Sequence, residues 1–254
     1  MDVSVILPHY NNKELAEKSV RVLSGYLGGC GLSHEIVVVD DGSDPDQRPD
    51  MDRTGENIRL VQIEKNRGKG FAVRQGMLAA KGDCCIYTDI DLPYDLTAIP
   101  YAVALVRDGT DFVGGDRALF HSVDGVHRPL MRRFASRVFS KLVALLVIGG
   151  IIDSQCGFKA FSRRLVQALF PLLTIDRFSF DVEIYYLLLR YNISMKRIPV
   201  RLHHHDVSTV SVFRHFMDMT MGVFSIPLKW HSGRYASERM RDFYPQDRYW
   251  EAKA

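Results

Sequence analysis

The first half of the sequence predicts an α/β protein with a doubly wound, mostly parallel sheet. Short apolar runs alternate there with segments whose apolar residues recur at helical spacing. The links between these segments are short, which favours βαβ units. Acidic or glycine-rich turns follow several of the apolar runs. Ligands of such sheets bind beyond the carboxyl ends of the strands, so these turns are the first candidates for a site.

Each expected element of this half has its own signature. Apolar or alternating runs predict strands over residues 3–7, 35–39, 58–63, 84–88 and 111–114. Apolar residues at helical spacing predict helices over residues 13–27, 71–80 and 95–107. Pro8 is expected to stop the first strand, and the stretch 44–57, rich in Asp, Pro and Arg, is expected to be a loop.

The second half is less regular. We expect a basic amphipathic helix at 128–148, a strand at 158–161, a helix at 180–191 and a last strand at 195–200. Residues 206–254 are rich in Met and aromatic residues and predict an amphipathic helical tail. This tail would pack against the domain or lie on a membrane surface. The chain is therefore expected to divide into a domain of residues 1–205 and a tail of residues 206–254.

Length and composition fit one large domain with a modest extension, because 46% of the 254 residues are hydrophobic. The longest uncharged apolar run, 142–152, is much shorter than the ~20 residues that span a bilayer and predicts a buried helix. No basic segment precedes the first apolar run, so no secretory signal is expected. The four cysteines lack metal-ligand spacing and are expected to be reduced thiols of a cytoplasmic protein.

Charge is unevenly distributed along the chain. Residues 1–116 carry 12 Lys and Arg against 19 Asp and Glu, whereas residues 117–254 carry 21 against 11. The basic half favours an anionic partner such as a phosphate or an anionic lipid, or else forms a solvated basic face. A nucleic-acid-binding module would explain this charge but not the acidic strand ends, so no nucleic acid is expected as a partner.

Asp89 and Asp91 directly follow the fourth expected strand. Two carboxylates at this spacing can share one hard divalent cation, Mg²⁺ or Mn²⁺, and diphosphate oxygens can complete its shell. Such an ion offsets the negative charge of a departing nucleoside diphosphate. A D-x-D pair alone is a weak signal, but its position at a strand end favours a metal site.

Two further turns are expected at the same crevice. Asp40 ends the second strand and is expected to contact a ribose or a base, although Asp41-Gly42-Ser43 also has the composition of a turn held by Asp side chains. The turn 66–70 (NRGKG) precedes a helix, and its glycines allow close backbone approach. Because helix N-termini attract anions, Lys69 in this turn is a candidate donor-binding residue.

These motifs resemble, in their order, those of family 2 glycosyltransferases. The matching stretches are 5–11 (VILPHYN), 38–43 (VVDDGS), 66–76 (NRGKGFAVRQG) and 89–91 (DID). Three later stretches look like the polyprenyl- or dolichyl-phosphate glucosyl/mannosyl transferase branch: 115–117 (GDR), 153–159 (DSQCGFK) and 177–183 (RFSFDVE). The resemblance implies a GT-A-type, Rossmann-like fold, with a nucleotide-sugar half over residues 1–116 and an acceptor half over residues 117–205.

The resemblance also implies roles for individual residues. Donor binding is implied for Pro8, Tyr10, Asn12, Asp40, Lys69 and Asp89, and metal binding for Asp89 and Asp91. Arg117 matches the arginine of a Gly-Ser-Arg motif that faces the phosphates, and joins Asp91 and Asp181 as an expected catalytic residue. Acceptor binding is implied for Arg132, Ser136 and Gln155. An arginine and a hydroxyl on one helix face can clamp a phosphate, although both could be plain exposed residues.

Asp181 has two alternative roles, which depend on the acceptor. A glycan or protein hydroxyl needs a general base, and Asp181 is the best-placed candidate. A lipid phosphate brings an oxygen that is already anionic, so Asp181 and Glu183 would instead orient neighbouring groups. Glu183 could alternatively be a helix N-terminal charge that interacts with the helix dipole.

Three single positions and one stretch depart from the family pattern. Asn12 stands where Glu is usual, Pro93 where Gln is frequent, and Asp116 in place of the serine of the Gly-Ser-Arg motif. The stretch 203–206 (HHHD) replaces a Gly-x-Ser-Lys stretch. Because Pro93 offers no side-chain ligand, His203 or His205 is a candidate to complete the metal shell; the alternative is a polar loop.

The sequence therefore predicts an inverting, metal-dependent glycosyltransferase that moves a hexose from a nucleoside diphosphate sugar to a polyprenyl phosphate. UDP-glucose is the first expected donor and GDP-mannose the second, because residues 155–159 look closer to the glucosyl branch. The expected location is the cytosolic face of a membrane, with peripheral contact through helix 128–148 and the tail. Transfer to a glycan or protein hydroxyl is one alternative, and a metal-dependent nucleotidyltransferase is another.

Overall fold

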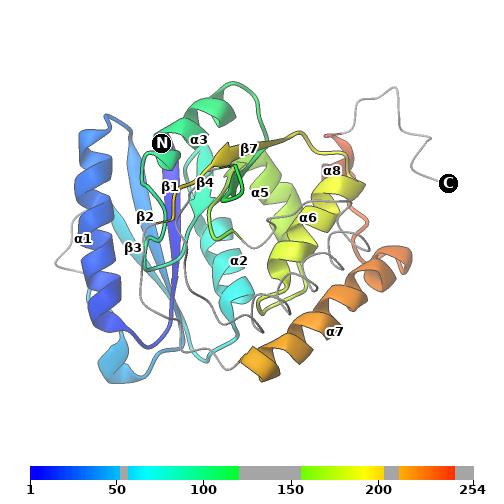
Figure 1. Cartoon of the computed structure of the whole chain (residues 1–254), viewed down its shortest axis with the longest axis horizontal. Helices are drawn as coiled ribbons and strands as arrows, with labels where there is room; N and C mark the ends of the chain where they lie inside the picture. Colours follow the sequence, from blue (N-terminus) through cyan, green and yellow to red (C-terminus); the bar gives the residue numbers. More distant parts are fainter. Residues whose placement is uncertain (52–56, 120–155, 203–211, 244–254) are drawn as a thin grey trace.

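A computed structural model describes residues 1–51, 57–119, 156–202 and 212–243 (Figure 1). Its strands are β1 (Val3–His9), β2 (His34–Asp41), β3 (Ile58–Ile63), β4 (Cys84–Tyr87), β5 (Phe112–Asp116), β6 (Lys159–Ser162) and β7 (Met195–Pro199). They form a seven-stranded sheet with the order β3-β2-β1-β4-β6-β5-β7. In this sheet β6 runs antiparallel to both of its neighbours, and the other pairs are parallel. The mostly parallel sheet predicted from the sequence is thus confirmed.

Helices cover both faces of the sheet. They are α1 (Lys13–Gly29), α2 (Lys69–Ala79), α3 (Ala98–Arg107), α5 (Arg163–Leu169), α6 (Phe180–Arg190), α7 (Val212–His231) and α8 (Glu238–Arg241), with short 3₁₀ turns at Pro45–Gln47 and Phe170–Leu172. Buried side chains of α1 and α3 pack with one face, in a core that includes Leu23 and Ile99. Buried side chains of α2, α5, α6 and α7 form the core on the other face, which includes Val73 and Leu187.

Pro8 does not stop the first strand, which continues to His9. The expected end at residue 7 is wrong because of how β1 is paired. On its β4 side the pairing runs only from Val3 to Ile6, whereas on its β2 side it runs on to His9. A proline lacks only the N–H, so it is tolerated where a strand edge has no partner left to bond.

Helix α2 begins at Lys69, two residues before the expected start at residue 71. Gly70 looks like a turn residue in the sequence, but it is required inside the helix by close packing. A Cβ at Gly70 would lie 2.6 Å from the carbonyl oxygen of Ile175 and 2.8 Å from Cβ of Phe180. Helix α5 was not predicted at all, because its seven residues are too few to show a helical period.

Part of the C-terminal segment packs against the sheet core. Val223 and Ile226 of α7, together with Tyr235 and Met240, are buried among residues of α2, α5 and α6. Among the described residues, no helix is long and apolar enough to cross a membrane. The helix expected at 128–148 and the apolar run 142–152 lie outside the described residues.

The described cysteines are free thiols, as the sequence predicts. Cys84 and Cys85 occupy neighbouring positions on β4 and face opposite sides of the sheet. Burial raises the pKa of Cys85 to about 12, so this thiol stays protonated and unreactive.

Candidate active site

The carboxyl ends of the parallel strands bring the predicted turns to one edge of the sheet. β1 and β2 end at His9 and Asp41, and β4 ends at Tyr87, two residues before Asp89. Because β6 is antiparallel, it contributes its first residue, Lys159, to this edge, opposite Tyr87. The edge of the sheet predicted to carry the site is therefore built by residues from both halves of the sequence.

Asp89 lies at the centre of this edge, in contact with Lys69 and Gly157. Nζ of Lys69 donates to Oδ1 of Asp89 at 2.5 Å. A Cβ at Gly157 would lie only 2.2 Å from Oδ2 of Asp89, so the carboxylate rests against the Gly157 main chain. The Gly157 amide in turn donates to the hydroxyl of Tyr94 at 3.1 Å. Gly157 is thus the residue that makes room for the predicted metal ligand.

Three of the predicted carboxylates act on the same ammonium group. Burial alone would lower the pKa of Lys69, but the negative charges of Asp89, Asp181 and Asp91 outweigh it and raise this pKa. Lys69 is therefore a cation in an acidic site, as expected for a place that can also hold a divalent ion. Hard carboxylate oxygens suit Mg²⁺ or Mn²⁺.

Among the described residues, side chains alone do not form a metal shell. Within the described part of the chain, no group of three or more His, Cys, Asp or Glu residues is arranged to hold a metal ion. Oxygens of a substrate diphosphate could fill the positions of a shell that Asp89 and Asp91 leave open. His203 and His205, proposed from the sequence as additional ligands, lie outside the described residues, as do Arg132, Ser136 and Gln155.

Asp181 belongs to a buried ion pair beneath the crevice. Oδ1 of Asp181 accepts a hydrogen bond from Nζ of Lys159 at 2.7 Å and another from the hydroxyl of Tyr87. Lys159 is fully buried, and its ammonium also donates to the carbonyl of Cys156 at 2.6 Å. Burial and the charge of Asp181 raise the pKa of Tyr87 far above its usual range, so Tyr87 stays a hydrogen-bond donor.

The predicted nucleoside side of the crevice is built from the ends of β1 and β2. Tyr10 is 51% exposed, and Pro8 is partly buried beside Val39 of β2. Oδ1 of Asp40 accepts from the amide of Ser43 at 3.2 Å, so Asp40 also holds its own turn. Asn12 caps helix α1 through a bond from the Leu15 amide at 3.3 Å, which gives it a structural role beside the predicted donor contact.

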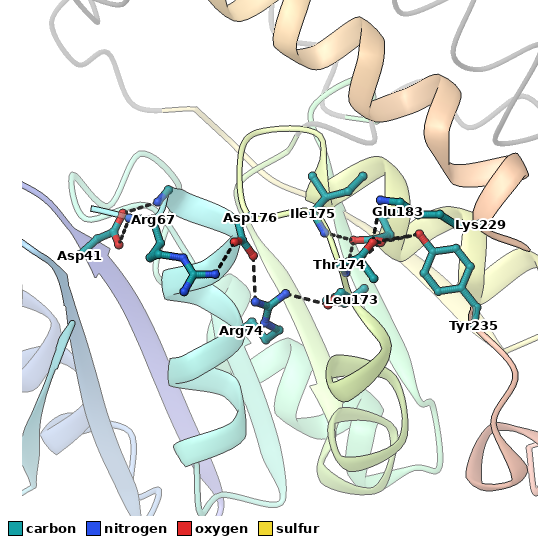
Figure 2. A network of polar contacts seen from close by, with 11 residues as sticks. Asp41, Arg67, Arg74, Leu173, Thr174, Ile175, Asp176, Glu183, Lys229 and Tyr235 are labelled. Carbon is teal, nitrogen blue, oxygen red and sulfur yellow. Dashed lines mark hydrogen bonds and ion pairs between the residues drawn. The ribbon is translucent and has the colours of Figure 1, made fainter. Parts of the chain in front are cut away.

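Asp41 ties the Lys69 turn to the sheet. Its two carboxylate oxygens accept from the amides of Arg67 at 2.9 Å and Gly68 at 2.7 Å (Figure 2). Across the turn, Asp176 accepts from the guanidinium groups of Arg67 and Arg74 at 2.9 and 2.8 Å. The turn that precedes α2 is therefore held from two sides by carboxylates.

Glu183 fixes the segment that carries Asp176. It is fully buried and accepts from the amides of Thr174 and Ile175, each at 3.0 Å, and from the hydroxyl of Tyr235 at 2.5 Å (Figure 2). Lys229 of α7 donates to the Thr174 hydroxyl at 2.9 Å. Glu183 therefore orients neighbouring groups, which is one of its two expected roles, and it also lies in the first turn of α6, as the other role requires. Through Tyr235 it links the C-terminal segment to the segment that carries Asp176.

Arg117 follows β5 on the Gly157 side of the crevice. Burial raises the pKa of the Tyr94 phenol, and the positive charge of Arg117 partly offsets this rise. Arg117 therefore lies near Tyr94. The preceding residue, Asp116, is buried and accepts from Arg197 at 2.9 Å and from the Ala118 amide at 2.8 Å. Asp116 thus shapes the turn that positions Arg117.

Comparison with known proteins identifies the family. A model of glycosyl transferase family 2 matches residues 4–170. A dolichyl-phosphate beta-glucosyltransferase of Dictyostelium discoideum is 31% identical, over 91% of this chain and 75% of its own length. The chain belongs to glycosyltransferase family 2. A protein of the same name from Drosophila melanogaster is 29% identical, over 92% of this chain and 77% of its own length.

A solved structure shows the same fold. Glucosyl-3-phosphoglycerate synthase of Mycobacterium tuberculosis, determined with Mn²⁺ and UDP, aligns with a TM-score of 0.61 at 17% identity. The alignment covers 96% of this chain and 81% of that one. The GT-A fold implied by the motifs of this family 2 glycosyltransferase is therefore confirmed.

Several residues of the site were not singled out from the sequence. Lys159, Tyr87 and Gly157 lie within or beside predicted motifs, but no role was derived for them. A lysine inside a short apolar run is an available signal, because a buried lysine needs a partner of opposite charge. Asp176 carries no such signal, since its partners are about a hundred residues away in the chain, as Arg74 shows.

Replacement of Gly157 by Ala tests whether close packing against Gly157 positions the carboxylate of Asp89. The added Cβ would overlap Oδ2 of Asp89, so the carboxylate must move, and a misplacement near 1 Å lowers catalysis by about a hundredfold. The measurement is kcat/KM for glycosyl transfer. Gly28→Ala is the matched control, because a Cβ there meets nothing within 4 Å. A Gly157→Ala enzyme with wild-type activity would contradict this packing role.

Proposed function

We propose that this family 2 glycosyltransferase transfers glucose from UDP-glucose to a polyprenyl phosphate with inversion at the anomeric carbon. The observation that carries the proposal is the pair of carboxylates after β4, Asp89 and Asp91, whose charges act on Lys69 at one edge of the sheet. The similarity to two proteins named dolichyl-phosphate beta-glucosyltransferase supports the acceptor class and the sugar.

The donor half of the site would bind through both charge and shape. Asp89 and Asp91 would hold Mg²⁺ or Mn²⁺, which when bound supplies a Lewis acid for the diphosphate leaving group. Lys69 and Arg117 would neutralise further phosphate charge, since both are cations at the same edge of the sheet. Pro8, Tyr10, Asn12 and Asp40 would line the nucleoside part of the crevice. The M. tuberculosis neighbour with Mn²⁺ and UDP supports the choice of ion and nucleotide.

A phosphate acceptor fits the state of Asp181 better than a hydroxyl acceptor does. The general base for a hydroxyl must be free to take a proton. Oδ1 of Asp181 is already engaged by the ammonium of Lys159 and the hydroxyl of Tyr87. A phosphate oxygen is anionic and needs no base, so in this proposal Asp181 orients Lys159 and adds negative charge beneath Lys69.

A lipid acceptor also requires contact with a membrane. Phe224 and Leu228 lie on one face of α7 and are 57% and 71% exposed. Because such side chains favour an apolar medium, we include in the proposal that this face rests on a bilayer. The Phe224→Ser/Leu228→Ser variant is expected to bind anionic vesicles about tenfold more weakly in a flotation assay. Tyr101→Ser, an exposed residue of α3, is the control, and equal binding by the double variant would contradict this contact.

The decisive experiment is a transfer assay with purified protein, Mn²⁺ and polyprenyl phosphate in vesicles. UDP-glucose and GDP-mannose are supplied in parallel, and the products are separated as lipid and aqueous fractions. Glucosyl lipid with release of UDP supports the proposal. Transfer to an added alkyl glycoside instead of the lipid would favour hydroxyl chemistry, and release of pyrophosphate would favour a nucleotidyltransferase. Absence of any transfer from either donor would reject the proposal.

A further inference from the structure

Lys69 already occupies the carboxylate that a metal ion would need. Its ammonium lies 2.5 Å from Oδ1 of Asp89. The other carboxylate oxygen rests against the main chain, where a Cβ at Gly157 would stand 2.2 Å away. Asp89 is therefore held between a protein cation on one oxygen and the Gly157 backbone on the other.

A metal ion and the Lys69 ammonium cannot both bind Oδ1 of Asp89. Two cations bound to one carboxylate oxygen would lie close enough to repel each other strongly. An ion can therefore bind Asp89 only when Lys69 moves away. Lys69 has the means to do so, because it is the first residue of α2 and carries a flexible four-carbon stem.

The ammonium that leaves Asp89 needs another anion. It lies beside the N-terminus of α2, where the first turn of the helix contains no acidic residue. A diphosphate that reached this turn would offer its anionic oxygens to the ammonium in place of the Asp89 carboxylate. The same diphosphate would offer oxygens to the incoming ion. One diphosphate could thus pair with the Lys69 ammonium and also complete the coordination shell of the metal ion.

We propose that Lys69 is a resident cation that occupies Asp89 until a nucleoside diphosphate arrives, and then exchanges Asp89 for the diphosphate as the metal ion binds. The inference rests on the proposed function, which assigns the metal to Asp89 and Asp91. It makes metal and nucleotide bind cooperatively, and linkage requires that each strengthens the binding of the other by the same factor.

The test measures Mn²⁺ affinity by electron paramagnetic resonance, with and without UDP. Wild-type protein is expected to bind Mn²⁺ weakly alone and more tightly with UDP. Lys69→Met removes the competing cation, so Mn²⁺ alone is expected to bind about tenfold more tightly, and the strengthening by UDP is expected to shrink by a similar factor. Lys69→Arg keeps the charge and should retain weak binding of Mn²⁺ alone. Lys65→Met, an exposed lysine of the same loop, should match wild type.

An unchanged or weaker affinity of Lys69→Met for Mn²⁺ alone would overturn the inference. Asp89→Asn separates this result from a failure of the proposed function. If Asp89→Asn binds Mn²⁺ with UDP as wild type does, the metal site itself is misplaced and the proposed function is in error. If Asp89→Asn abolishes that binding while Lys69→Met behaves like wild type, only the role of Lys69 as a competing cation is rejected.

Discussion

Asp89→Asn is expected to lower kcat/KM for glycosyl transfer about a thousandfold, because a metal ion supplies several kcal/mol of charge stabilisation to a leaving diphosphate. Asn keeps the shape of the side chain and can still accept from Lys69, so the loss reflects the missing charge and metal ligand. The measurement is initial rate with saturating Mn²⁺, together with the affinity for Mn²⁺ in the presence of UDP.

The control for Asp89→Asn is Asp83→Asn, at the other end of β4 from Asp89. Asp83 is exposed and precedes β4 at the opposite edge of the sheet. Asp83→Asn removes the same charge far from the crevice and is expected to change the rate by less than about twofold, as for most surface substitutions. Retention of more than about a tenth of wild-type activity by Asp89→Asn would place the chemistry elsewhere.

The sequence predicts the structure best where the pattern lies within a single strand and the turn that follows it. Buried parallel strands are continuous apolar runs, and Asp89 and Asp91 follow one of them within four residues of its end, so both the strand and the acidic pair could be predicted. The turn before α2 was predicted on the same grounds. These features depend on local sequence, because the chain reaches the sheet edge within a few residues of each run.

The part that could not be predicted depends on which strands become neighbours. β6 inserts between β4 and β5, although it follows both in the sequence. That insertion sets Lys159 opposite Tyr87 and brings both to Asp181. The contact between Glu183 and Tyr235 likewise joins residues 52 positions apart. Strand order of this kind follows from packing of the whole domain, which no local pattern records.

The second large expected effect is a loss of stability when the buried ion pair of Lys159 and Asp181 is broken. Lys159→Met and Asp181→Asn are each expected to lower the free energy of unfolding by about 3–5 kcal/mol, because each leaves an uncompensated charge in the core. The melting temperature would fall on the order of 10 °C. The Lys159→Met/Asp181→Asn double variant removes both charges and is expected to recover most of this loss, since Asn still accepts from Tyr87 and Met packs against aromatic rings.

A double-mutant cycle by denaturant unfolding measures this coupling. Lys13→Met is the control, because Lys13 pairs with Glu17 on the surface of α1 at 3.9 Å and should contribute no more than about 0.5 kcal/mol. Losses of the two single variants that simply add in the double variant would show that the charges do not depend on each other.

The stable double variant also separates the two possible roles of Asp181. A general base cannot be replaced by Asn, so hydroxyl chemistry predicts near-complete loss of transfer even when the fold is restored. With a phosphate acceptor, Asp181 acts mainly by pairing with Lys159, so the double variant, which replaces both partners, should keep much of its kcat. Asp181→Asn alone cannot make this distinction, because the unpaired Lys159 would disturb the site whatever the acceptor is. The comparison of the single and double variants therefore identifies the acceptor class from the protein side.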